Sequence, residues 1–201
     1  MPAFTRRLVL IYTLGCLALC SPAYSQWRGS TEVGAERFWG GSLETTGEHR
    51  SFRPYRPTTM GIGLEHQGER LSLGLQIRYA EAALALEGSD AVVAVDGVFD
   101  IIGFAPELVY RLVRVGAVNQ LRLHAGPLIE IWTVVDEEAR VRAGAQATLS
   151  FDVPLGSRFG ASILAGAALG ASPFNEDELE PSYELRALWR RRFAVALGYR
   201  L

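Results

Sequence analysis

The chain has 201 residues, of which 21% are charged, and its formal net charge is −2. This length suits one ordinary domain, and a nearly neutral balance provides no polybasic surface for nucleic acid. Both cysteines, Cys16 and Cys20, lie close to the N-terminus. The remainder of the chain has no cysteine, so a disulfide framework and a thiolate metal site are excluded there.

The N-terminal segment has the order of a secretory signal peptide. Two arginines at residues 6–7 precede an apolar run over residues 8–19, and small residues follow at 23 and 25. An apolar run of about a dozen residues is shorter than the roughly 20 that a membrane-spanning helix needs, so we favour cleavage over anchoring. We expect a signal peptide over residues 1–25 and one mature domain over residues 26–201.

The mature chain shows a period of two in its apolar residues. Between residues 141 and 153 the odd positions are apolar, whereas the even positions are polar or glycine. This alternation indicates strands with one apolar face. The same pattern recurs along the chain and predicts eight strands, at about residues 31–39, 57–66, 70–84, 99–113, 120–134, 139–153, 158–170 and 183–201.

The expected connections alternate in length. Short turns are predicted near residues 67–69, 116–119 and 154–157, and longer loops over 40–56, 85–98 and 171–182. Short periplasmic turns and longer outer loops are typical of transmembrane barrels. We therefore predict an all-β fold, an eight-stranded antiparallel up-and-down transmembrane barrel with both mature termini on the periplasmic side.

The residue types favour an apolar exterior and a polar interior. All twenty basic residues are arginine, whose fixed fork of donors suits carboxylates in a narrow space. Glycines recur on the polar face, where they would make room for long side chains. We expect an interior network of buried ion pairs that fills the lumen, formed by Glu65, Arg78, Glu107, Arg111, Arg122, His124, Glu130, Arg140, Arg142, Arg186 and Arg190.

The end of the chain carries a family resemblance. Phe193, Val195, Leu197, Tyr199 and Leu201 resemble the C-terminal assembly strand of bacterial outer-membrane barrels, with Leu201 in place of the usual terminal aromatic. The chain as a whole resembles the small OmpA/OmpX-like or OmpW-like barrels of the porin family. The resemblance implies a Gram-negative outer membrane, contact with its lipid and lipopolysaccharide, and insertion by the barrel assembly machinery.

The polar residues give little sign of chemistry. The histidines His49, His66 and His124 lack metal-ligand spacing, so we expect no metal and no cofactor. The loop over residues 40–56, rich in arginine, is a candidate contact for lipopolysaccharide phosphates, although we favour the simpler interpretation of a solvated loop.

These observations favour a non-enzymatic outer-membrane protein with a structural, adhesive or narrow-pore transport role. Two alternatives stay open. One is a soluble periplasmic lipocalin-like barrel that binds a small apolar ligand, with the apolar face turned inward. The other is an outer-membrane lipid-modifying enzyme, which the lack of a Ser–His pair on the apolar face disfavours.

Overall fold

The chain forms a closed antiparallel β-barrel. A computed structural model describes residues 26–44, 51–87, 92–134, 138–175 and 180–201, so the expected signal peptide lies outside the described residues. The wall strands are β1 (Trp27–Trp39), β3 (Ser51–His66), β4 (Leu71–Glu87), β5 (Val92–Val115), β6 (Asn119–Val134), β7 (Arg140–Pro154), β8 (Phe159–Gly170) and β10 (Leu188–Arg200). Two short strands, β2 (Ser42–Glu44) and β9 (Tyr183–Leu185), form a separate sheet.

Closure joins the first strand to the last. The wall strands follow the order β1, β10, β8, β7, β6, β5, β4, β3, and β3 pairs again with β1. The β1–β10 pairing runs from Arg28 opposite Arg200 to Trp39 opposite Trp189. Because closure leaves no unpaired edge strand, the wall can sit in hydrocarbon with most of its backbone groups bonded. The predicted eight-stranded barrel is confirmed.

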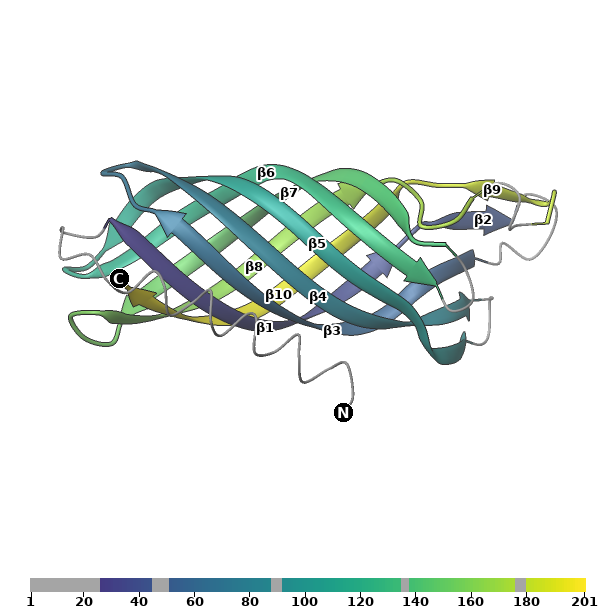
Figure 1. The fold of residues 1–201 in the computed structure, drawn as a ribbon, viewed down its shortest axis with the longest axis horizontal. Helices are drawn as coiled ribbons and strands as arrows, with labels where there is room; N and C mark the ends of the chain where they lie inside the picture. Colours follow the sequence, from purple (N-terminus) through teal and green to yellow (C-terminus); the bar gives the residue numbers. More distant parts are fainter. Residues whose placement is uncertain (1–25, 45–50, 88–91, 135–137, 176–179) are drawn as a thin grey trace.

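The two ends of the barrel differ. The short connections after His66, Val115 and Pro154 lie at the end where β1 begins and β10 finishes (Figure 1). We call this the periplasmic end, because short turns and both termini mark that side of such barrels. At the opposite, outer end, the β2–β9 sheet projects beyond the wall, as Figure 1 shows.

Several strands are longer than the sequence pattern predicted. β3 begins at Ser51 and β5 at Val92, so strand structure occupies parts of the expected loops 40–56 and 85–98. The prediction missed these extensions because register shifts between Tyr55 and Thr58 of β3 and between Ala82 and Leu84 of β4 interrupt the period of two there.

The last expected strand, 183–201, is divided. Tyr183–Leu185 pairs with Ser42–Glu44 outside the wall, and only Leu188–Arg200 joins the barrel. The period of two passes through both segments, so the pattern alone hid the break. The expectation of one continuous strand here is wrong.

One seam in the wall lacks regular pairing. The β5–β6 ladder is interrupted between residues 104 and 108 of β5 and between 125 and 129 of β6. Pro106 and Pro127 lie opposite each other in this stretch by continuation of the register, and neither has a backbone N–H to donate. Behind the seam, inside the barrel, a small apolar cluster is packed, composed of Ala105, Leu128 and Ala168.

The faces of the wall have the predicted orientation. Leu149, Ile163, Val195 and Leu197 point outward, with between 44% and 51% of their surface exposed. The inward positions between them carry Ser150, Ser162 and other buried polar residues. A soluble lipocalin-like barrel needs the opposite arrangement, so that alternative is wrong. Within the described residues, no helix is long and apolar enough to cross a membrane.

The outer half of the lumen contains an apolar plug. Inward-facing Phe38, Phe99 and Trp132 pack edge to face with centroid separations of 5.7–6.1 Å. Phe174, which follows β8, contacts Phe99 in the same way, at 6.1 Å. The remaining members of this buried cluster, hereafter the plug, are Ala80, Ala82, Ile101 and Leu188.

Candidate functional site

The periplasmic half of the lumen contains a cluster around Arg122. Its guanidinium donates to both oxygens of Glu65, at 2.7 and 2.8 Å, and also pairs with Asp152. Arg28 reaches Asp152 at 3.3 Å and the hydroxyl of Ser162 at 3.1 Å. These residues come from β1, β3, β6, β7 and β8, so their contacts join opposite sides of the wall.

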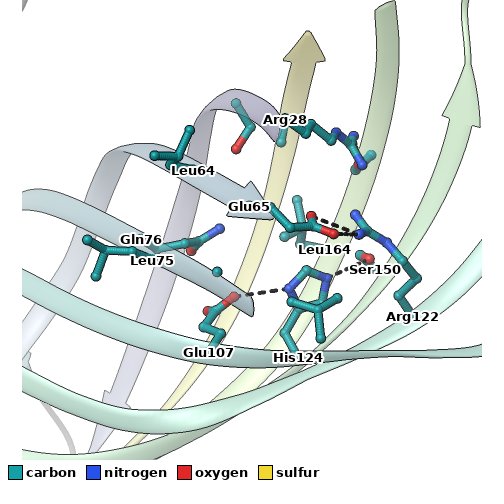
Figure 2. A pocket seen from close by; sticks show the side chains of 16 residues that line it. Arg28, Leu64, Glu65, Leu75, Gln76, Glu107, Arg122, His124, Ser150 and Leu164 are labelled. Carbon is teal, nitrogen blue, oxygen red and sulfur yellow. Dashed lines mark hydrogen bonds and ion pairs between the residues drawn. The ribbon is translucent and has the colours of Figure 1, made fainter. Parts of the chain in front are cut away.

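A chain of hydrogen bonds crosses the middle of the lumen. Figure 2 shows His124 between Glu107 and Ser150, with Nδ1 at 3.0 Å from Glu107 Oε2 and Nε2 at 2.9 Å from Ser150 Oγ. An ionised carboxylate can only accept, so the Nδ1–H of His124 donates to Glu107, and Nε2 forms a hydrogen bond with the Ser150 hydroxyl. Gln146 donates to the other oxygen of Glu107 at 2.6 Å and accepts from Arg78.

The chain continues into a third cluster below the plug. Glu36 lies 3.6 Å from Arg78 and 3.3 Å from Arg190, and Arg190 reaches Glu130 at 2.7 Å. Arg192 lies 4.0 Å from Glu36 and also pairs with a neighbouring carboxylate, Glu32. All of these side chains are buried. Their contacts stabilise the lumen only as a set, because removing one partner leaves another charge buried without compensation.

Inward glycines leave room for these side chains. A Cβ at Gly61 would lie 2.7 Å from Glu32 Oε1 and 3.0 Å from Arg78 Cγ. A Cβ at Gly198 would overlap the guanidinium of Arg28. Small residues on this face therefore free the volume that the long arginine and glutamate side chains occupy.

Three further arginines bind backbone or amide oxygens at the outer end. Arg140 donates to the carbonyl of Pro173 at 2.9 Å, and Arg142 donates to Asn175 Oδ1 at 2.6 Å. Arg53 donates to the carbonyl of Phe38 at 3.1 Å. Arg140 and Arg142 thereby hold the segment after β8, including Phe174, against the barrel.

The structure places most of the expected interior residues on the inner face. Arg111 is half-buried near the periplasmic end, and its side chain has no ion-pair partner among the described residues. Arg186 contradicts the expectation. It lies between β9 and β10 with 53% of its side chain exposed, where it pairs with Glu184 at 2.7 Å. The cause is the break after Leu185, which takes Arg186 out of the wall.

The sequence-based list omitted several members of the network. Glu32 and Glu36 lie on β1, the expected strand with the weakest alternation, and Arg28 lies before its predicted start. The even positions 32, 34 and 36 are polar or glycine, so a period-two test on that strand could have found both glutamates. The hydroxyl and amide partners Ser150 and Gln146 carry no charge that would have marked them.

The expected assembly strand lies at the end of β10, and the last part of the expected outer loop belongs to β3. Phe193, Val195 and Leu197 point outward, while Tyr199 packs on Phe159 at 4.9 Å and the backbone N–H of Leu201 donates to Trp27. In the expected loop 40–56, Arg53 points into the lumen and Arg56 is exposed. His49 and Arg50 lie outside the described residues.

Little space is left around the central hydrogen bonds. The cavity beside Glu107, His124 and Ser150 has a volume of about 40 Å³, enough for a few water molecules at most. A wider vestibule of about 320 Å³ opens at the periplasmic end, below Arg122 and Asp152. Within the described residues, no group of three or more His, Cys, Asp or Glu residues is arranged to hold a metal ion.

A closed eight-stranded barrel with an apolar exterior and a charged, filled interior defines the class of small outer-membrane β-barrels. Such an exterior is stable only with hydrocarbon around it, which places the protein in the bacterial outer membrane.

Comparison with solved structures supports this class. Neisserial surface protein A (NspA) is similar with a TM-score of 0.58 and 7% identity, covering 88% of this chain and 98% of that one. OprG of Pseudomonas aeruginosa is similar with a TM-score of 0.53 and 11% identity, covering 88% and 97%. At these identities the likeness concerns the fold. Comparisons with protein-family models and with curated protein sequences each find no match.

Proposed function

We propose that the protein is a non-enzymatic outer-membrane barrel whose lumen is closed by its own side chains. The observation that carries the proposal is the succession of barriers along the lumen, from the Arg122 cluster through the Glu36 cluster to the plug. Eight strands enclose a space that side chains can just fill. A closed lumen favours a structural or adhesive role, performed by the outer surface and the outer end, over narrow-pore transport.

The second part of the proposal concerns how the barrel is assembled. β1 begins at Trp27, two residues after the expected signal-peptide cleavage, so residues 26–201 contain the complete wall. β10 supplies both the terminal apolar residues and the strand that closes against β1. We propose that the barrel assembly machinery recognises this strand and that outer-membrane lipid and lipopolysaccharide surround the folded wall.

The runner-up is a hydrolase, because Ser150, His124 and Glu107 have the order of a nucleophile, a base and an orienting acid. Burial argues against it. Ser150 is 1% exposed, and an acyl substrate does not fit a space of about 40 Å³. The Ser150 hydroxyl also faces the lumen, whereas the acyl chains of a membrane lipid lie outside the wall. These three residues are better explained as filling and cross-linking the interior.

Two measurements on the refolded barrel test the proposal. In planar bilayers we expect no stable channel current, with an open trimeric porin as the positive control. With a fluorophosphonate probe, which labels activated serines, we expect no modification of Ser150. A steady ohmic current would favour transport instead, and labelling that His124→Gln abolishes would favour the hydrolase.

A further inference from the structure

Two aromatic pairs define the edges of the lipid face on β10. Tyr199 lies opposite Phe159 near the periplasmic end, and Trp189 lies opposite Trp39 near the outer end. Ten residues separate Tyr199 from Trp189, which at the usual rise and tilt of barrel strands is about 25 Å along the membrane normal. This distance matches the apolar band of outer-membrane barrels, so Trp39 and Trp189 mark the outer-leaflet interface.

Two arginines form the next outward-facing residue pair, on the side of Trp39 and Trp189 that is nearer the centre of the membrane. Arg37 and Arg191 lie directly opposite each other on β1 and β10, and both are exposed. Their guanidinium carbons lie 5.5 and 5.1 Å from the ring centroid of the same residue, Trp39. The two positive charges are thus held over one indole ring.

The environment of this pair is unlike that of the arginines in the lumen. Neither guanidinium forms an ion pair with a carboxylate among the described residues, whereas Arg78, Arg122 and Arg190 each do. Like charges directly opposite each other destabilise a sheet. Contact with the Trp39 ring offsets part of that repulsion, and an anion between the two guanidinium groups would remove it.

The position determines which anion is available. At the boundary between acyl chains and headgroups, the abundant anions are lipid phosphates, and arginine binds phosphate through two parallel N–H donors. Trp39 and Trp189 beside the pair provide apolar surface for the adjoining part of a lipid. We propose that Arg37 and Arg191 form a binding site for the phosphate group of an outer-leaflet glycolipid, clamped between β1 and β10 and flanked by Trp39.

The site differs from the arginine-rich segment 40–56 that the sequence pointed to. Arg53 of that segment is turned into the lumen, so it cannot reach a lipid headgroup. The proposed site instead straddles the junction at which the barrel closes. A bound phosphate would therefore also link the first and last strands of the wall.

The test measures binding of diphosphoryl lipid A to the refolded barrel in uncharged detergent micelles by native mass spectrometry. Arg37→Gln/Arg191→Gln should weaken the apparent affinity about tenfold or more, because two charge-assisted contacts are lost. The matched control is Arg70→Gln/Arg114→Gln, which removes two exposed arginines at the periplasmic end and should leave the affinity within about twofold of the parent. Heat-modifiable gel mobility confirms that each variant is folded.

Two further probes identify the ligand group. Dephosphorylated lipid A should bind as weakly to the parent as diphosphoryl lipid A binds to the double variant. Inorganic phosphate at millimolar concentration should not displace the lipid, because it lacks the apolar part. Equal binding of lipid A by the parent and the Arg37/Arg191 variant, equal losses in both double variants, or displacement by inorganic phosphate would each overturn the proposal.

Discussion

Individual arginine residues have different roles that depend on the face and height they occupy. Arg190 is buried between Glu36 and Glu130 and contributes to closing the lumen. Arg140 bonds a loop carbonyl and holds the segment after β8. Arg37 faces lipid. The same side chain serves all three positions because its planar donors match carboxylates, carbonyls and phosphates.

The buried pairs should be far more sensitive to substitution than the exposed one. Glu36→Gln leaves the buried side chains of Arg190, Arg78 and Arg192 short of negative charge, so we expect the free energy of unfolding to fall by about 3–5 kcal/mol. The control, Glu184→Gln, breaks an exposed pair with Arg186 and should cost no more than about 1 kcal/mol. Urea unfolding in lipid vesicles measures both, and equal losses would show that the buried network does not stabilise the barrel.

At the scale of the element, β10 combines three functions in thirteen residues. Its outward residues form part of the lipid face, its inward arginines enter the lumen network, and its backbone closes the wall against β1. Because backbone groups without partners cost several kcal/mol each in hydrocarbon, the three functions cannot be separated by truncation. Deleting residues 193–201 should abolish insertion, whereas Leu201→Phe should preserve or improve it.

Single substitutions on β10 can separate its two faces. Val195 points outward, four residues from Tyr199 and six from Trp189, so it lies near the middle of the lipid band. Val195→Arg should cost about 2–4 kcal/mol, and Ala196→Ser, which faces the interior, should cost much less. Heat-modifiable gel mobility after reconstitution reports folding of each variant. If Val195→Arg folds as well as Ala196→Ser, the assignment of the faces is wrong.

At the scale of the whole molecule, the lumen has two closures of different chemistry in series. Ion pairs and hydrogen bonds fill the periplasmic half and the middle, and the plug fills the outer half. The ionic part fixes side-chain geometry through directional contacts, whereas the plug gains from burial of aromatic surface. We expect each closure to obstruct a lumen of this width by itself.

Removal of the plug's largest side chain tests this arrangement. Trp132 is 1% exposed, so Trp132→Ala should lower the free energy of unfolding by about 3–5 kcal/mol through the lost contacts and the cavity left behind. Planar-bilayer recordings should nevertheless show no stable current, because the Glu36 cluster remains below. A current that appears in Trp132→Ala but not in the parent would mean that the plug alone closes the lumen.

The sequence by itself determined the architecture and the direction of the faces. The period of two in the apolar residues showed which residues share a face of each strand. The use of arginine without lysine, together with glycines on the polar face, favoured that face as the interior. The strands that alternate most strongly, β7 and β8, were located to within one residue at each end. These properties are local, since each is decided by neighbours along one strand.

Only the tertiary structure decided which charged residues form ion pairs and where the lining of the lumen changes from charged to apolar. Arg190 and Glu36 are 154 positions apart in the chain, and their contact depends on the register of every strand between them and on closure. Phe38 and Trp132 occupy inward positions, yet alternation does not encode their depth, so the plug was not predicted. Arg186 left the wall because pairing with β2 competes for the segment before β10, and no local pattern reports that competition.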